Sequence, residues 1–215
     1  MKRVNALLMM LSDLGWSNVR VGEPEGIMND VVRAIEQSFR ELLCDKRYKS
    51  ITVKDICERA HVSRKTFYTN FRDKEDIISY IFKRDIIQPL HHINAVFTRE
   101  EAKGMTPTIQ TKIYRTIFED REYYRNLVVS MKGRDDTFIR VATNAIYEFD
   151  CEVLNRIGFK GDEQHADYIS YFYASSQAML MQKWIFDNFS LSPDELSRLY
   201  FSMTLEFWRT VADYM

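Results

Sequence analysis

The stretch from Ile51 to Lys74, ITVKDICERAHVSRKTFYTNFRDK, constrains the fold of this chain more than any other stretch does. Thr52 and Asp55 have the spacing of a capping box, in which a hydroxyl and a carboxylate satisfy free backbone N–H groups at the start of a helix. Apolar residues at four-residue spacing follow on one face of that helix. The chain must turn sharply at His61, and histidine tolerates positive φ better than most non-glycine residues. The pattern therefore predicts a short helix ended by a tight turn.

A second short helix is predicted directly after the turn, with Ser63 as its N-cap. It runs from Arg64 to about Phe71 and buries Phe67 and Phe71, which lie four residues apart. Its opposite side carries cations, hydroxyls and an amide. A helix with such a face suits the major groove of DNA, where these groups meet phosphates and base edges.

Nine residues of this stretch are expected to contact DNA, and they divide into two groups. Those expected near base edges are Arg64, Lys65 and Thr66, with Lys54 of the preceding helix nearby. Those expected to hold the phosphate backbone are Thr52, Tyr68, Thr69, Asn70 and Lys74.

The charge distribution points to the same site. Residues 46–74 contain nine lysines and arginines against three acids, a net charge of +6 in a chain whose formal net charge is −1. A basic patch on an otherwise acidic protein is typical of a nucleic-acid-binding surface. A solvated charged face without a ligand is the alternative, and the polar face of the second helix favours DNA.

The string Ile51-Thr52-Val53-x-x-Ile56-x-x-x-Ala60-x-Val62-Ser63-x-x-Thr66-Phe67-Tyr68-x-x-Phe71-x-x-Lys74-Glu75 resembles the helix-turn-helix of the TetR family of bacterial transcriptional regulators. The resemblance includes the helices before and after this string. It implies a three-helix DNA-binding domain, a helical regulatory and dimerisation domain, and a phosphate contact by Lys74. His61 stands where glycine is common, and Asn70 where His or Tyr is frequent, so the contact at Asn70 can differ.

The rest of the chain is predicted to be helical as well. Only seven glycines and four prolines leave little room for the turns of an all-β protein, and 46% hydrophobic residues are ample for a core. We expect an all-α, TetR-like fold, with a polar loop at 98–104. The remaining helices are expected at 30–44, at 73–89, from Pro107 at a first helical position, at 121–131, at 136–157, at 163–189 and at 193–214, where Ser192 and Glu195 form a second capping box.

Three regions follow from this reading: residues 1–27, a helix-turn-helix domain at 28–90, and a helical effector and dimerisation domain at 91–215. Residues 1–27 are either an N-terminal arm or a mis-called leader. We hypothesise that the natural start is Met28, since Met28-Asn-Asp-Val-Val opens the first family-like helix directly. Intact-mass analysis of the native protein decides between the two, because a mass that includes Met1 or Lys2 excludes the hypothesis.

The two C-terminal helices are expected to pair with those of a second copy. Their placement resembles the dimerisation bundle of TetR-family proteins, and small residues in the first of them let another helix approach closely. A two-fold dimer presents two recognition helices to successive major-groove faces. The expected interface residues are Tyr171, Ala174, Ser175, Ala178, Leu199, Met203, Phe207 and Val211.

A candidate effector pocket is formed by aromatic and methionine side chains of the C-terminal domain. Its expected residues are Tyr114, Phe118, Tyr147 and Met179. An ordinary helical core explains the same residues equally well. The segment Tyr123-Tyr124-x-x-Leu127, with Trp184, resembles regulators of dihydroxyacetone kinase operons, which implies a protein partner. The effector is therefore an unknown small molecule or protein.

Other classes of function find little support. No Glu-x-x-His pair, nucleophile elbow or phosphate-binding glycine loop is present, so neither an enzyme nor a cofactor is expected. Adjacent His91 and His92 point about 100° apart on a helix, which disfavours a metal site. No stretch approaches the ~20 apolar residues of a membrane span. Three isolated cysteines fit a reducing cytoplasm, where the chain is expected at the nucleoid.

The sequence therefore predicts a transcriptional regulator, a repressor that binds double-stranded palindromic operator DNA as a homodimer. The alternative is a helical protein-interaction or co-activator module of the same family that reads little DNA of its own.

Overall fold

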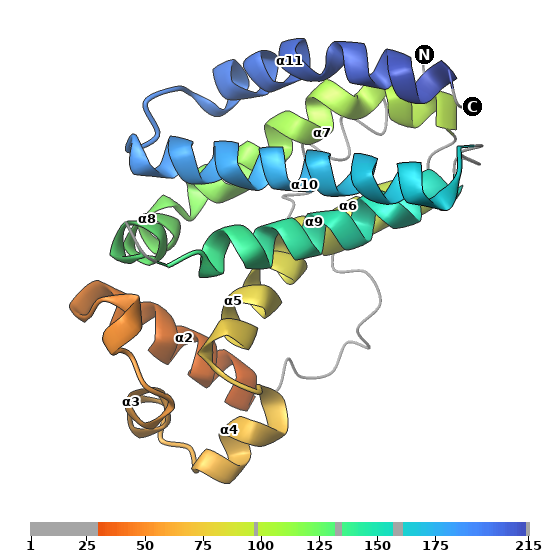
Figure 1. Cartoon of the computed structure of the whole chain (residues 1–215). Coiled ribbons are helices and arrows are strands. Elements are labelled where there is room, and N and C mark those ends of the chain that lie inside the picture. Colours follow the sequence, from red (N-terminus) through yellow and green to blue (C-terminus); the bar gives the residue numbers. More distant parts are fainter. Residues whose placement is uncertain (1–29, 97–98, 132–134, 157–160, 214–215) are drawn as a thin grey trace.

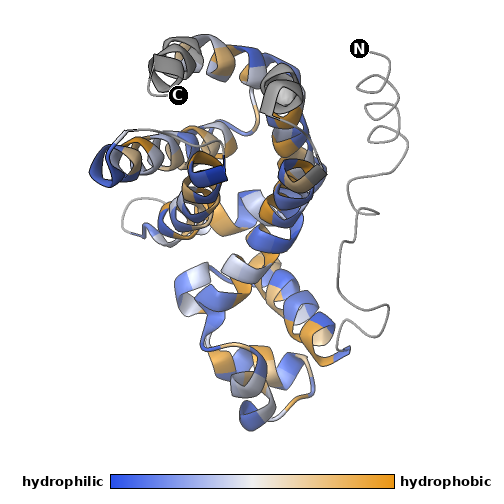
Figure 2. Cartoon of the chain, turned by 90° about the vertical axis from the view of Figure 1, so that its right-hand side faces the viewer, coloured by the Kyte–Doolittle hydropathy of each residue, from blue (hydrophilic) through white to orange (hydrophobic). Residues whose placement is uncertain are grey.

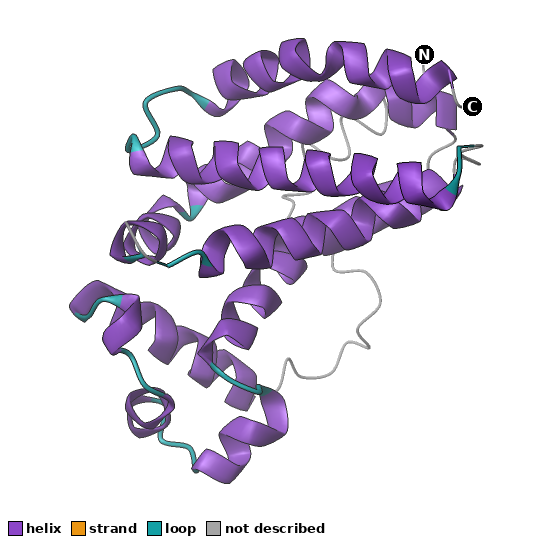
Figure 3. Cartoon of the chain, viewed as in Figure 1, coloured by secondary structure: helices purple, strands orange, loops and turns teal. Residues whose placement is uncertain are grey.

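The computed structural model describes residues 30–96, 99–131, 135–156 and 161–213, apart from the side chains of residues 96, 99–107 and 205–213. The hypothesis about residues 1–27 lies outside this range. Within it, every secondary-structure element is a helix (Figure 3). The predicted all-α fold is confirmed. None of the helices in these ranges has the length and apolar character of a membrane span.

The N-terminal domain packs three helices, two of them short, at one end of the molecule (Figure 1). They are α2 (Asp30–Asp45), α3 (Val53–Arg59) and α4 (Arg64–Asn70), with a 3-10 turn, η2 (Tyr48–Ser50), between the first two. Ile35, Phe39, Ile56 and Phe67 are fully buried where the apolar stripes of these helices meet. This core fixes the two short helices that two turns of propensity alone cannot stabilise.

One helical run connects the two domains. It consists of α5 (Lys74–Phe82), a π turn, η3 (Lys83–Ile87), and α6 (Gln88–Val96). Asp73 caps its start by accepting hydrogen bonds from the backbone N–H groups of Glu75 and Asp76. The predicted end near Pro89 is wrong, because the helix continues to Val96. Pro89 has no N–H to donate to the preceding turn, and the wider π turn lies directly before it. The predicted boundary between residues 90 and 91 thus falls inside α6.

The C-terminal domain is a bundle of α7 (Arg99–Glu119), α8 (Arg121–Ser130), α9 (Thr137–Arg156), α10 (Glu163–Phe186) and α11 (Pro193–Asp213). α10 lies along α9, and α11 lies along α7 (Figures 1 and 2). The loop expected at 98–104 and the helix start expected at Pro107 are wrong, since α7 begins at Arg99. The capping box of Ser192 and Glu195 is confirmed by hydrogen bonds in both directions.

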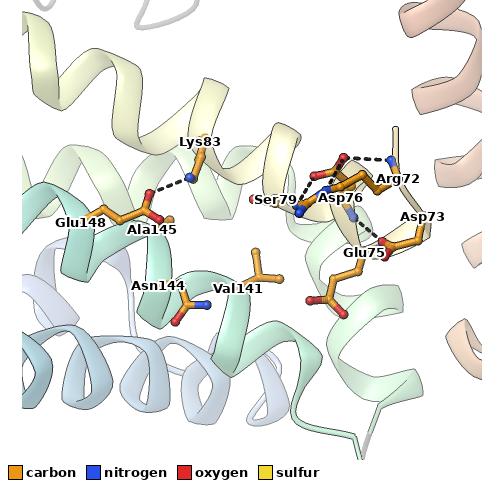
Figure 4. A pocket seen from close by; sticks show the side chains of 10 residues that line it. All are labelled: Arg72, Asp73, Glu75, Asp76, Ser79, Lys83, Val141, Asn144, Ala145 and Glu148. Atoms are coloured by element: carbon orange, nitrogen blue, oxygen red, sulfur yellow. Dashed lines mark hydrogen bonds and ion pairs between the residues drawn. The ribbon is translucent and has the colours of Figure 1, made fainter. Parts of the chain in front are cut away.

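A polar crevice separates α5 from α9 (Figure 4). Its volume is about 280 Å³. Lys83 donates to Glu148 across it at 2.6 Å, and Arg140 is paired with Glu75 beside it. Because one partner of each pair lies on α5 or η3 and the other on α9, the pairs tie the connecting helix to the C-terminal domain.

Candidate nucleic-acid interface

The start of α3 is closed by the predicted capping box. The Thr52 Oγ1 accepts from the Asp55 N–H at 3.1 Å, and the Asp55 carboxylate accepts from the Thr52 N–H at 2.8 Å. Hydrogen bonds from the Thr52 backbone and hydroxyl and from Lys46 lower the Asp55 pKa to about 2. The carboxylate therefore stays ionised and keeps the cap closed at neutral pH.

The turn after α3 adopts a left-handed conformation at His61, where φ is 54°. The Val62 N–H donates to the Cys57 carbonyl at 3.0 Å, and the His61 N–H donates to the Glu58 carbonyl at 3.4 Å. These two bonds form a Schellman motif, which satisfies the last carbonyls of a helix and reverses the chain. The positive φ predicted at His61 is confirmed, and it sets the angle between α3 and α4.

Helix α4 packs on the domain through its apolar face, and its polar face is exposed to solvent. Ser63 accepts from the Thr66 N–H at 3.0 Å, and Phe67 and Phe71 are buried under the helix with ring centroids 6.0 Å apart. On the opposite side Arg64 and Lys65 are exposed, as is 58% of Tyr68. The predicted division of this helix into an apolar and a polar face is therefore present.

Several of the expected DNA contacts make local hydrogen bonds. The Thr69 hydroxyl donates to the Lys65 carbonyl at 3.0 Å, and the Asn70 amide donates to the Thr66 carbonyl at 2.8 Å. The Thr66 hydroxyl lies 2.8 Å from that of Ser63. These bonds fix the side chains on α4 while leaving acceptor atoms on the hydroxyl and amide groups.

Lys74 lies in a less exposed position than the sequence suggested. Its ammonium donates to the Tyr48 carbonyl at 2.7 Å and to the Ile51 carbonyl at 2.8 Å, and it stacks 4.1 Å from the centroid of the Tyr48 ring. Burial lowers the pKa of Lys74. Two of its three N–H donors are thus used to fasten α5 to the segment before α3, and one remains for the predicted phosphate contact.

The basic patch is partly neutralised within the protein. Lys46 pairs with Asp55, Arg59 with Asp45, and Arg72 with Asp76. Lys54 lies 3.6 Å from Glu58 on the exposed side of α3. Arg64 and Lys65 form no ion pair with another described residue. Two cations available to an external anion therefore lie side by side at the start of α4.

Sequence reasoning missed an ionic network where the two domains meet. Arg40 of α2 donates to Glu36 at 2.9 Å and to Asp120 at 2.6 Å, and Arg84 of η3 donates to Glu36 and, at 2.6 Å, to Asp85. We call these five residues the junction network. Its partners are up to 80 residues apart in sequence. The available signal was Glu36, an acid on the apolar stripe of α2 that is only 7% exposed.

The electrostatics of the junction network follow from its burial. Burial raises the pKa of Glu36, but the hydrogen bond and charge of Arg84, with those of Arg40, outweigh this and lower it. Burial raises the pKa of Asp120 against the opposing effect of Arg40. The guanidinium groups therefore stabilise the ionised forms of Glu36 and Asp120 against the effect of burial.

The expected interface residues divide between two faces of α10. Tyr171 is 59% exposed, and on α11 Leu199 is 44% and Met203 57% exposed. Ala174 and Ala178 are fully buried, because they form the face of α10 that packs inside the protomer; their expected place in a dimer interface is wrong. Ser175 is partly exposed between the two faces. The side chains of Phe207 and Val211 lie outside the described residues.

The expected pocket residues do not line one cavity. Tyr114 is fully buried against Trp184, with ring centroids 5.6 Å apart, and Phe118 stacks on the same indole. Tyr147 is partly exposed and donates to Asp167 of α10. Met179 is 60% exposed, so its expected place in a pocket is wrong, because it lies on the outer face of α10 with Tyr171.

His91, the first of the two adjacent histidines, contacts two residues of α9. His91 lies 3.1 Å from Glu152 and edge-on to Phe149. No group of three or more potential ligands capable of holding a metal ion occurs in the described part of the chain.

Comparisons with known proteins show that both halves of the chain match family models. Residues 40–81 match the family model of bacterial regulatory proteins of the tetR family, and residues 107–205 match that of a transcriptional regulator C-terminal region. A solved structure of a putative TetR-family transcriptional regulator from Syntrophomonas wolfei superposes with a TM-score of 0.60 at 18% identity, covering 82% of this chain and 94% of that one. This likeness shows the fold.

Two curated relatives share sequence with the chain. The HTH-type dhaKLM operon transcriptional activator DhaS of Lactococcus lactis is 34% identical over 56 residues, which cover 26% of this chain and only 30% of the relative. An uncharacterised HTH-type transcriptional regulator of Bacillus subtilis, YvkB, is 22% identical over 153 residues, covering 65% of this chain and 77% of the relative. The likeness to a dihydroxyacetone kinase operon regulator is thus confirmed over a limited stretch. With its helix-turn-helix, its matching C-terminal region and its fold, the chain belongs to the TetR family of bacterial regulatory proteins.

Proposed function

We propose that this TetR-family transcriptional regulator is a cytoplasmic repressor that binds a palindromic operator as a homodimer and is controlled by an effector at its C-terminal domain. The outer face of α4 carries this proposal. Arg64 and Lys65 are exposed there without an ion pair to another described residue, and Tyr68 is 58% exposed beside them. A protein-interaction module with little DNA reading of its own has no need of such a face.

The geometry of α4 suits base reading. Its N-terminus is fixed by Ser63 and by the Schellman turn at His61, so its first residues project in defined directions. Recognition helices contact base edges mainly through their N-terminal residues. Arg64 and Lys65 hold these positions on α4, whereas Tyr68 lies one turn further along, and its proposed contact is with the phosphate backbone.

Replacing Lys65 by alanine is expected to weaken binding to the preferred operator and to relax base preference at one position of each half-site. A side-chain contact to a base edge contributes about 1–3 kcal/mol of discrimination. The measurement is fluorescence anisotropy on the DNA directly upstream of the chain's own gene and on single-base variants of it.

Two further variants serve as controls for Lys65→Ala. Tyr68→Phe should weaken binding to all these duplexes alike, because it removes a phosphate contact. Arg125→Ala removes one exposed cation from α8, far along the chain from α4, and should leave binding unchanged. An unaltered base preference in Lys65→Ala would contradict the assignment of Lys65 to base reading.

The proposed dimer uses the outer face of α10 and the exposed residues of α11. This face combines four large apolar side chains of α10, each at least 59% exposed, with two of α11: Tyr168, Tyr171, Phe172, Met179, Leu199 and Met203. Large apolar side chains exposed in this number mark an interaction surface. A second copy related by a two-fold axis covers them and presents two α4 helices to one palindrome.

Replacing Met203 by glutamate is expected to raise the dimer dissociation constant by about tenfold or more, because a charge enters an apolar contact without a partner. Sedimentation velocity over a concentration series measures this directly. The matched control is Val129→Glu on α8, where an apolar residue is 45% exposed outside the proposed interface. Dimers of unchanged strength in Met203→Glu would exclude this face.

In the proposed regulation, a conformational change at the effector site reaches the DNA-binding domain through the junction network and the connecting helix. A shift of α6 in the C-terminal domain moves η3 and α5 as one helical run, and α5 is fastened to the DNA-binding domain through Lys74. A reporter gene behind the operator decides the direction of control. Expression that rises on deletion of the regulator supports repression. Expression that falls supports activation, as in the name of the lactococcal relative, a transcriptional activator.

A further inference from the structure

A line of hydrogen bonds joins α8 of the C-terminal domain directly to the DNA-binding domain. It involves three residues at four-residue spacing along α2 and η2, each bonded to one residue at or next to α8: Arg40 to Asp120 at 2.6 Å, Cys44 to Asn126 at 3.5 Å and Tyr48 to Ser130 at 3.2 Å. We call these six residues the α2–α8 interface. Its partners span the whole of α8, from the residue before its start to its last residue, so they fix the direction of α2 against α8.

The two ends of the α2–α8 interface are its strongest points. The pair of Arg40 and Asp120 is partly buried, so it is screened less by water than an exposed ion pair. Tyr48 is only 4% exposed, and its backbone N–H donates to the Ser130 hydroxyl, which in turn donates to the Leu127 carbonyl at 2.7 Å. Removal of that hydroxyl takes away the acceptor of a buried N–H, which is costly.

The connecting helix alone does not fix how one domain is rotated against the other. Its π turn, η3, interrupts the regular hydrogen bonds of an α-helix where the chain passes between the domains. The ion pairs that tie this helix to α9 are exposed, with Lys83 and Glu148 across the crevice of Figure 4 and Glu75 and Arg140 beside it. Exposed ion pairs contribute little and are screened by salt. The α2–α8 interface supplies the second attachment that fixes the orientation.

This orientation decides where the two recognition helices of a dimer lie. α3 and α4 lie on the side of the DNA-binding domain away from α8 (Figure 1), so a small rotation at the α2–α8 interface moves α4 by a larger distance. In the proposed dimer the copies pair through α10 and α11, and the separation of the two α4 helices therefore depends on this interface in each copy. One base pair added between two half-sites shifts one of them by about 3.4 Å and turns it by about 35°. A rigid pair of recognition helices accepts one spacing.

We propose that the α2–α8 interface determines the number of base pairs that the protein requires between the two half-sites of its operator. Asp120 and Ser130 are positioning residues, because they act on α4 through Arg40 and Tyr48. The inference rests on the proposed function, a dimer on a palindrome. It adds a determinant of operator specificity that lies outside the DNA-contacting surface.

Selection from a library of random duplexes measures half-site sequence and spacing together. The test variant is Asp120→Asn/Ser130→Ala, which weakens both ends of the interface and changes no residue of the DNA-binding domain. The wild type should enrich palindromes of one spacing and bind duplexes one base pair longer or shorter about tenfold or more weakly. The variant should enrich the same half-site sequence at two or more spacings, with affinities that differ by about threefold or less.

The matched control is Asp194→Asn/Thr116→Val. It also removes the acid of an Arg–Asp pair, that of Arg115 at 2.8 Å, and a hydroxyl that donates to a carbonyl of its own helix, but both sites join parts of the C-terminal domain. It should retain the single wild-type spacing. Circular dichroism verifies that each variant is folded, and Ser130→Ala alone is the test variant if the double variant is not.

The outcomes separate this inference from the proposed function. A single, unchanged spacing in the test variant would overturn the inference, and so would a wild type that accepts several spacings equally. A changed half-site sequence in the test variant would also overturn it, because the interface would then act on base reading. A wild type that enriches no palindrome would contradict the proposed function itself, and this inference with it.

Discussion

Replacing Arg40 by alanine is expected to lower the free energy of unfolding by about 3 kcal/mol, the cost typical of leaving buried carboxylates without their cation. Arg40 contacts Glu36 and Asp120, and its guanidinium lies 4.2 Å from the centroid of the Tyr123 ring. Without Arg40, only Arg84 of the junction network remains to neutralise three acids. The change also removes packing from the Tyr123 ring.

Urea denaturation of the full-length chain at pH 7 measures this loss, with Arg125→Ala as the control. Arg125 is an exposed arginine that forms no ion pair with a described residue, so its removal should change the free energy of unfolding by less than about 0.5 kcal/mol. The effect of Arg40→Ala should shrink as the pH falls below the ordinary pKa of Glu36. The lowered pKa of Glu36 stabilises the fold above that value, and the stabilisation is lost as the carboxylate is protonated. Similar stability of both variants would contradict the role of the network.

Replacing Asp150 by asparagine is expected to stabilise the ligand-free protein by about 2–4 kcal/mol at pH 8 and by much less at pH 5. The folded state holds the Asp150 proton up to a pKa of about 8, whereas the unfolded chain releases it near the ordinary pKa of aspartate. Stability of the wild type therefore falls as the pH rises through this window and levels off above pH 8. The upper limit of about 6 kcal/mol for the full shift is reduced because Asp150 keeps some exposed surface.

Thermal and urea unfolding at the two pH values check this second prediction. Glu152→Gln is the control on the same helix, because its exposed pair with His91 contributes at most about 1 kcal/mol. A gain in stability that is equal at pH 5 and pH 8 would show that Asp150 is ionised throughout.

The helix-turn-helix was predictable because its signals are local. Thr52 with Asp55, Ser63 and Asp73 each close a helix through contacts with residues two or three positions away. The positive φ at His61 was predictable for the same reason, because only a short turn connects α3 and α4. Sequence patterns of this range are nearly independent of tertiary packing.

The parts that sequence reasoning missed depend on long-range packing. The apolar residues of α10 occupy two faces, so periodicity did not reveal that Ala174 and Ala178 point inward and Met179 outward. Pro107 is common at helix starts, yet α7 continues through it from Arg99, since one missing N–H costs a single hydrogen bond in a helix held by its neighbours. The junction network joins residues that no local pattern connects.

Selection from a library of random DNA duplexes tests the central claim most directly, since it requires no assumption about which gene is controlled. The full-length protein should enrich one two-fold symmetric motif, with half-sites centred about 34–36 Å apart or at a multiple of that distance. Its affinity should exceed that for scrambled DNA by about 10³ or more and fall steeply with salt. The double variant Arg64→Ala/Lys65→Ala should enrich no motif. Enrichment of no symmetric motif by the wild type, with equal affinity for all duplexes, would contradict the assignment of α4 as the reader of a palindromic operator.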